Sequence, residues 1–308
     1  MIDEKLLLIS HVADPDGITP IILAKMVYKE VDVILLNPNE VDEKLEENID
    51  KYNLIHITDL SITELLAKKI EDEYKNKVKL FDHHKTALNL NKFSFAKVVI
   101  EEDNKKQSAT SIYYKYLLKL SNNKLLHKKV VKQLVEQVRI IDTYDFKTEN
   151  DKLSLNLEYL FSILGRDNYV DYFRKYIKNN DEFKYTEKEN YLIKLQKDKI
   201  DNYIKQKEEE VIFAKYKNYK IALVYAESNR SILGNYLLKK YDIDFSIIIN
   251  ISKGISYRGN DKVDLSIIAK EQGGGGHKNA SGSPLPTDIL EKITKYIYKD
   301  IEIIKEDE

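Results

Sequence analysis

The sequence predicts an α/β protein with two domains: a doubly wound, mostly parallel sheet, then a long linker helix, then a smaller α/β domain with a mixed sheet. Three observations support this. Short apolar runs alternate with amphipathic stretches over the first 120 residues, a charge-dense helical stretch covers 181–210, and a second group of apolar runs follows. The predicted boundaries are 1–180 for the first domain, 181–212 for the linker helix and 213–308 for the second domain.

The first domain is predicted to alternate strand and helix. The apolar runs LLLIS, VDVILLN, LIHIT and VKLF predict four strands. Apolar residues at helical spacing predict the helices 17–30, 41–52, 61–75, 108–120, 125–141 and 153–180. In a doubly wound sheet, ligands bind beyond the carboxyl ends of the strands. The residues directly after each apolar run are therefore the candidates for function.

The second domain shows fewer elements. The runs KIALVYA, FSIIINIS and GISYR predict strands, and residues 231–240, 264–271 and the segment from 287 onward predict helices. The charge run at 181–210 is typical of a solvated helix face rather than of a binding tract.

Composition restricts the chemistry and the partners. The 308 residues include no cysteine, so a metal site must use His, Asp and Glu, and no disulfide is available. The 50 basic and 51 acidic residues nearly cancel, which predicts no affinity for long duplex nucleic acid or for a membrane surface. An acidic N-terminus and the lack of an apolar stretch of about 18 residues predict a cytoplasmic location.

Acidic and histidine residues gather where the predicted strands end. SHVADPDG places His11, Asp14 and Asp16 on one loop, with Gly17 permitting a tight turn into the next helix. Asp59 ends the third strand. Because parallel strands end at one edge of a sheet, we expect these side chains to meet in space.

Two further motifs extend this set. FDHH supplies Asp82, His83 and His84 after the fourth strand, and Asp142 ends a helical stretch. A lone aspartate at a strand end is more often a helix cap, and a histidine pair is often incidental. Four such clusters in the order of a doubly wound sheet favour a metal site instead. Hard carboxylate and imidazole ligands suit Mn²⁺, with Mg²⁺ or Co²⁺ as alternatives, and several anionic ligands can hold two ions that activate a water and clamp a phosphate.

A glycine run stands out in the second domain. In GGGGHKNASG, Gly274, Gly275 and Gly276 would let backbone N–H groups approach an anion, and His277 and Lys278 add donors. A flexible loop is the ordinary alternative for such a run. Arg258, in SYRGN, precedes this run, and its ordinary interpretation is a surface arginine on an edge strand.

Two other histidines are not assigned to the site. His56 alternates within the strand LIHIT and is predicted to pack against a neighbouring element, whereas His127 is predicted to be exposed. Most of the tyrosines, such as Tyr113, Tyr114 and Tyr116, have helical spacing that suits a core.

The motifs together resemble the DHH family of phosphoesterases, which is named after the triplet at Asp82, His83 and His84, and the glycine run resembles the signature of its associated C-terminal domain. The resemblance implies one metal on His11, Asp14 and Asp59 and a second on Asp16, Asp59, His83 and Asp142. It also implies that Asp82 orients a ligand, that His84 contacts phosphate or protonates the leaving oxygen, and that Arg258 and the glycine signature hold substrate. One departure is that Asp14 lies three residues after His11, where many relatives have four.

Pairing of these two domains is similar to the oligoribonucleases, or nanoRNases, which implies hydrolysis of short RNA to mononucleotides. The alternatives are a phosphatase on 3′-phosphoadenosine 5′-phosphate and a phosphodiesterase on cyclic or linear dinucleotides. A family II pyrophosphatase lacks this glycine signature, and the large single-strand exonucleases of the family carry further domains. A non-catalytic nucleotide-binding protein would have lost ligands that are present here. The sequence leaves open whether the chain forms a homodimer.

Overall fold

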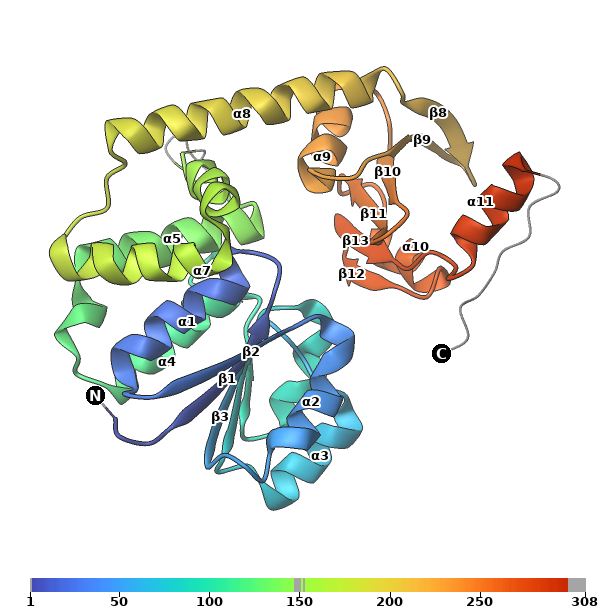
Figure 1. Cartoon of the computed structure of the whole chain (residues 1–308). Coiled ribbons are helices and arrows are strands. Elements are labelled where there is room, and N and C mark those ends of the chain that lie inside the picture. The colour runs from blue at the N-terminus through green and yellow to red at the C-terminus, as the bar shows by residue number, and fades with distance from the viewer. Residues whose placement is uncertain (1, 147–150, 152, 299–308) are drawn as a thin grey trace. The chain divides into compact units, whose positions relative to one another are not determined.

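The structure, a computed structural model, describes residues 2–146, 151 and 153–298. The chain forms two compact units, Met1–Lys197 and Asp198–Glu308 (Figure 1). Helix α8 (Glu187–Glu208) contains the boundary between them, so the long linker helix of the predicted fold is present but begins six residues later than the charged stretch.

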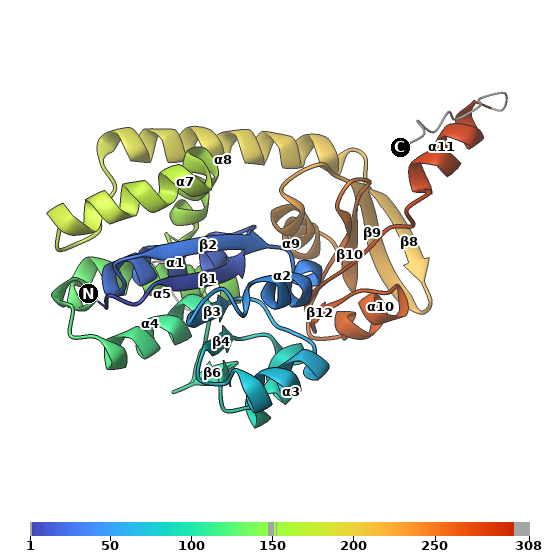
Figure 2. The ribbon, with the colours of Figure 1, turned by 60° about the horizontal axis from the view of Figure 1, so that its bottom comes forward.

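The first unit is built on a five-stranded parallel sheet in the order β2-β1-β3-β4-β5, as Figure 2 shows for the first four strands. This confirms the predicted doubly wound sheet. The direction of strand order reverses between β1 and β3, which is the point where such sheets bind ligands. The strands are β1 (Leu6–His11), β2 (Val31–Leu36), β3 (Leu54–Thr58), β4 (Val78–Asp82) and β5 (Ala96–Val98).

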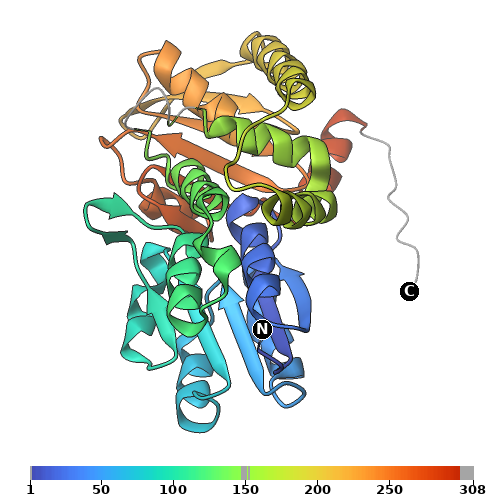
Figure 3. The same ribbon diagram turned by 90° about the vertical axis from the view of Figure 1, so that its left-hand side faces the viewer.

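Helices cover both faces of this sheet because side chains of β1 alternate between two buried layers. Leu6 and Leu8 pack under one helical layer, and Leu7 and Ile9 pack under the other. The first layer consists of α1 (Pro15–Val27), α4 (Ala109–Leu120), α5 (Lys129–Thr143) and α7 (Leu155–Asn179), visible together in Figures 1 and 3. The second consists of α2 (Val41–Asn48), α3 (Glu64–Glu73) and the 3₁₀ segment η2 (Lys85–Lys92).

The remaining short elements lie between these. They are the 3₁₀ turns η1 (Pro38–Glu40) and η3 (Lys124–His127) and a two-stranded ribbon of β6 (Glu101–Glu102) and β7 (Lys105–Lys106).

Local chemistry directs the chain from β1 into α1. Asp14 is the N-cap and accepts a hydrogen bond from the Gly17 amide at 3.0 Å, and Pro15 occupies the first helical position, where no N–H is needed. A Cβ at Gly17 would lie 2.1 Å from the carbonyl oxygen of His11. Only glycine therefore lets α1 begin this close to the end of β1.

The second unit has a six-stranded mixed sheet in the order β12-β13-β11-β10-β9-β8, in which only β9 and β10 are parallel among the described strands. The mixed sheet confirms the prediction. Its elements are β8 (Ile212–Tyr216), β9 (Tyr219–Tyr225), α9 (Arg230–Lys240), β10 (Phe245–Asn250), β11 (Gly254–Gly259), α10 (Leu265–Glu271), β12 (Gly275–His277), β13 (Ala280–Ser283) and α11 (Ile289–Ile297). Across the described residues, no helix combines the length and the apolar character needed to cross a membrane.

Candidate active site

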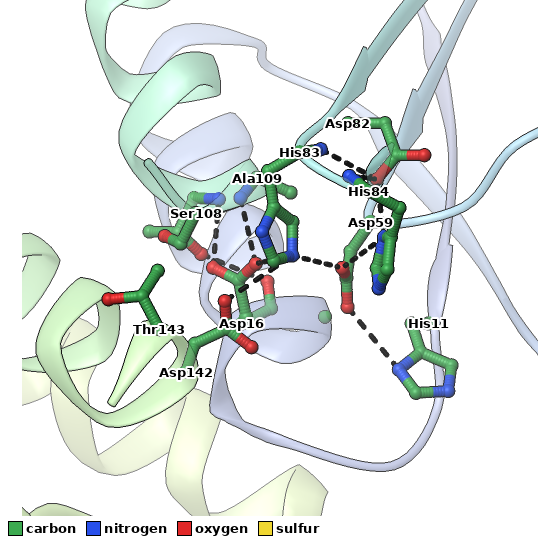
Figure 4. Close-up of polar contacts among 12 residues, drawn as sticks. His11, Asp16, Asp59, Asp82, His83, His84, Ser108, Ala109, Asp142 and Thr143 are labelled. Atoms are coloured by element: carbon green, nitrogen blue, oxygen red, sulfur yellow. Dashed lines mark hydrogen bonds and ion pairs between the residues drawn. The ribbon is translucent and has the colours of Figure 1, made fainter. Parts of the chain in front are cut away.

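The acidic and histidine residues of the first unit meet at the carboxyl edge of its sheet (Figure 4). His11 ends β1, Asp14 and Asp16 begin α1, and Asp59 follows β3. The others come from the end of β4 and from the last turn of α5: Asp82, His83, His84 and Asp142. Eight predicted residues from four segments of the sequence therefore surround one small volume.

Asp59 stands at the centre of this cluster. Its Oδ2 lies 3.3 Å from His11 Nδ1 and its Oδ1 lies 3.4 Å from His83 Nε2, so the two oxygens of one carboxylate face two different imidazoles. Its backbone has φ of 56°, a left-handed conformation that aspartate tolerates better than most residues. The Asp59 amide donates to Phe81 O at 3.0 Å, which fixes this conformation against β4.

The ligand atoms form three groups, each with all atoms within 4.8 Å of one another, and the third of these, Asp59, Asp82, His83 and His84, surrounds the triplet after β4. The first group is His11, Asp14 and Asp59, and the second is Asp16, His83 and Asp142. Within the first, His11 Nδ1 is 3.1 Å from Asp14 Oδ2. Within the second, His83 Nε2 is 3.3 Å from Asp142 Oδ2 and 3.8 Å from Asp16 Oδ2. Asp59 connects the groups through its contact with His83.

Buried carboxylate oxygens indicate that a cation fits here. Among the described residues, Asp59 Oδ1 and Asp142 Oδ2 are shielded from solvent and accept no hydrogen bond. A buried anionic oxygen without a hydrogen bond is costly unless positive charge compensates it. The donor set of carboxylates and imidazoles without thiolate matches divalent ions such as Mn²⁺ and Mg²⁺. The residues present therefore fit the metal that the motifs imply.

The protonation equilibria of the cluster show the same demand for positive charge. Burial, together with the charge of Asp59, raises the pKa of Asp16 to about 6, and burial raises the pKa of Asp142 well above its ordinary range. For His11, burial lowers the pKa, but hydrogen bonds to Asp14 and Asp59 outweigh it and raise the pKa to about 10. All three shifts are upward, so the cluster favours added positive charge.

The triplet after β4 is organised by Asp82. Its Oδ1 accepts hydrogen bonds from the amides of His83 at 2.7 Å and His84 at 3.2 Å, and it lies 2.7 Å from His84 Nδ1. Burial lowers the pKa of His84, but the charge of Asp82 outweighs it and raises the pKa to about 9. His84 therefore carries a proton near neutral pH, and its side chain remains 37% exposed.

A second support of the site has no motif of its own. The amides of Ala109 and Thr110, at the N-terminus of α4, donate to the two carboxylate oxygens of Asp16 at 2.8 and 2.9 Å. These bonds and the positive end of the helix dipole orient Asp16. The sequence indicates the Ser108 cap of this helix but not its contact with a residue 93 positions earlier.

Glu158 on α7 is a further carboxylate that sequence reasoning missed. Burial and the charge of Asp14 raise its pKa. Nothing in the local sequence of α7 distinguishes it from other helical glutamates.

The predicted substrate residues of the second unit lie on neighbouring strands. Arg258 on β11 and His277 on β12 both pair with Ala280 of the strand between them, so their side chains leave the same face of the sheet. Arg258 Nη1 donates to Tyr257 O at 2.8 Å and Nη2 donates to Ser231 Oγ at the start of α9. Lys278, by contrast, is exposed and lies 3.8 Å from Asp261.

The glycine run forms part of a hairpin rather than a free loop. A Cβ at Gly274 would lie 2.0 Å from Gly282 O, and Gly276 has φ of 134°. Gly275 begins β12 and has open space around it. Close backbone approach therefore requires glycine at two of the three predicted positions.

No family model matches the chain. Oligoribonuclease NrnB of Bacillus subtilis (strain 168) is 33% identical to it over 292 residues, which is 90% of this chain and 72% of that protein.

Solved structures share the fold. An exonuclease RecJ bound to manganese matches with a TM-score of 0.54 and 13% identity over 95% of this chain and 88% of that one. The DHH domain of a member of a ribosomal protein family matches with a TM-score of 0.59 and 13% identity over 96% and 86%. An exopolyphosphatase-related protein from Bacteroides fragilis matches with a TM-score of 0.53 and 18% identity over 96% and 91%.

Proposed function

Since the chain belongs to the DHH family of phosphoesterases, we propose that it hydrolyses short oligoribonucleotides to mononucleotides, with two divalent ions, Mn²⁺ first among them, as its cofactor. The observation that carries this proposal is the pair of ligand groups connected by Asp59. When bound, such ions supply Lewis-acid charge at a phosphate and make a water more acidic.

Each ion has its own proposed ligands, and the two ions share Asp59. His11, Asp14 and Asp59 would hold one ion, and Asp16, Asp59, His83 and Asp142 the other. The α4 amides hold the carboxylate of Asp16 in position for binding its ion.

His84 is suited to donate a proton. Its Nδ1 is engaged by Asp82, so Nε2 is the nitrogen that would donate to a substrate. A raised pKa keeps the ring protonated near neutral pH, and its partial exposure leaves it accessible to a substrate. We propose that His84 contacts the phosphate or protonates the leaving oxygen.

The second unit is proposed to hold the rest of the substrate. The guanidinium of Arg258 is positioned by Tyr257 O and Ser231, and a bidentate arginine suits a terminal phosphate. His277 leaves the same sheet face, and of the three glycines before it Gly275 has the open space in which an anion could approach the backbone.

Substrate length tests the proposal. The nearly neutral chain has no charge excess to add affinity for each further nucleotide of a long strand. The experiment measures kcat/KM with Mn²⁺ for RNAs of about 2 to 24 nucleotides, a range that spans one to many phosphate contacts. We expect kcat/KM to peak at about 2 to 5 nucleotides. The proposal is wrong if kcat/KM stays level or rises with length, or if only 3′-phosphoadenosine 5′-phosphate or a cyclic dinucleotide is consumed.

A further inference from the structure

The first unit contains a basic pocket far from the ligand cluster. It has a volume of about 480 Å³ and is lined at the end of α1, the start of β2, η3 and the end of α7. Asp14 and Asp16 lie at the opposite end of α1, whose 13 residues span roughly 20 Å at about 1.5 Å per residue. The pocket is therefore at the amino edge of the sheet, separate from the candidate active site.

Among the described residues, the charged side chains that line the pocket are all positive. Four of its residues are cations, namely Lys25, Lys29, Arg174 and Lys178, and no carboxylate lines it among the described residues. Met26, Val31 and Ile177 provide apolar walls. A hollow of this size with apolar walls and a few convergent charges is typical of a small-molecule site.

These cations are poorly compensated by the protein. Within the described part of the chain, Lys25 and Lys178 form no ion pair. Lys29 reaches Asp3 at 3.2 Å, where both side chains are exposed, and Arg174 lies 4.0 Å from Asp171. Exposed pairs of this kind contribute little, so most of the positive charge is available to a ligand.

Stabilisation of helix ends does not account for the arrangement. Lysine in the last turn of a helix offsets the helix dipole. Here, however, Lys128 Nζ donates to Ile177 O at 2.9 Å and to Asn180 O at 3.2 Å, and Asn123 Nδ2 donates to Met26 O. The carbonyl groups of Met26 and Ile177, in the last turns of α1 and α7, are therefore satisfied by residues other than the four cations.

The spacing of two of the cations on α7 is a second indication that an anion binds here. Arg174 and Lys178 are four residues apart on α7, and like charges at this spacing destabilise a helix. The cost is offset if an anion binds between them and Lys25 and Lys29.

We propose that this pocket binds a small polyphosphate-bearing ligand, such as a nucleoside triphosphate. The four cations match the clustered charges of a polyphosphate, and the apolar walls leave room for an organic group. The proposal does not depend on the function proposed for the metal cluster.

The test is fluorescence anisotropy of a ribose-labelled, non-hydrolysable ATP analogue with the full chain at saturating Mn²⁺. We expect Lys25→Gln with Lys178→Gln to raise the Kd at least about tenfold, because charge-assisted bonds to phosphate are lost. The matched control is Lys68→Gln with Lys75→Gln, which removes the same charge from exposed positions outside the pocket and should leave the Kd unchanged. Lys25→Arg with Lys178→Arg keeps the charge and should retain binding.

Further arms separate the pocket from the active site. Binding should persist in Asp59→Asn, and the Lys25→Gln and Lys178→Gln protein should cleave short RNA at the wild-type rate when no polyphosphate is present. Competition by inorganic tripolyphosphate as strong as by the unlabelled analogue would identify the phosphates as the recognised group, whereas preference for the nucleotide would identify the whole molecule. An unchanged Kd in the glutamine variant, loss of binding in Asp59→Asn, or competition by long RNA alone would overturn the proposal.

Discussion

His56, in β3, and His83, directly after the neighbouring strand β4, are both buried, yet they have opposite acid–base character. His56 lies in the middle of β3, 0% exposed, with aromatic rings around it and Tyr113 Oη 2.8 Å from its Nδ1. Burial, with the charge of Lys79, lowers the pKa of His56 to about 3. For His83, at the carboxyl edge and 7% exposed, burial also lowers the pKa, but Asp142 and Asp59 outweigh it and raise the pKa well above its ordinary value.

The difference shows that depth alone does not decide whether a polar group is functional. The middle of the sheet is enclosed by two helical layers and keeps a histidine neutral. The carboxyl edge concentrates five carboxylates around the site and therefore favours positive charge, whether from protons or from metal ions.

The sharpest test of this contrast is Asp59→Asn. It removes negative charge from the residue that faces both His11 and His83, while asparagine keeps the left-handed backbone that Asp59 adopts. We expect turnover to fall by more than about tenfold at saturating Mn²⁺, since even residues that only support a ligand typically cost 10- to 100-fold. Mn²⁺ affinity, measured by calorimetry, should fall as well.

Asp72→Asn on the exposed surface of α3 is the matched control and should change neither quantity. If Asp59→Asn retains more than about a tenth of wild-type turnover, the assignment of Asp59 to two ions is wrong.

A smaller effect is expected from His84→Asn, which separates proton transfer from metal binding. Asparagine can still approach Asp82 but cannot donate a proton to a leaving oxygen. We expect kcat to fall about 100-fold, within the range for general acid catalysis, while Mn²⁺ affinity stays near that of the wild type. An equal loss of Mn²⁺ affinity would instead make His84 a metal ligand.

Much of the first unit could be predicted because its signals are local. Each strand is a short apolar run, and the residues after it are at one edge by the geometry of parallel sheets. His56 and His127 also match their predictions, one buried in a strand and the other exposed.

Other features depend on tertiary contacts that no local pattern encodes. The α4 amides reach Asp16 across 93 residues, and the basic pocket joins residues from three separate segments of the sequence. Strand β8 was not predicted, because it is an edge strand whose Ile212 and Phe213 are 59% and 54% exposed, so it lacks an alternating buried pattern. The strands of the glycine hairpin were not predicted because glycine is, on average, disfavoured in strands.

The smallest effect is expected from His56→Gln, which tests the buried histidine in the middle of the sheet. The folded-state pKa of His56, about 3, lies below the ordinary value of 6.5, so between these values the unfolded chain binds a proton that the folded chain does not. Stability from the neutral His56 is complete above pH 6.5 and declines as the pH falls toward 3. Relative to His56→Gln, which does not titrate, the wild type should lose roughly 1 kcal/mol of unfolding free energy between about pH 7.0 and 5.5. Chemical denaturation of both proteins at the two pH values measures this difference. A gap between the two proteins that does not change with pH would show that His56 accepts a proton in the folded state, and the contrast between the middle of the sheet and its carboxyl edge would then fail.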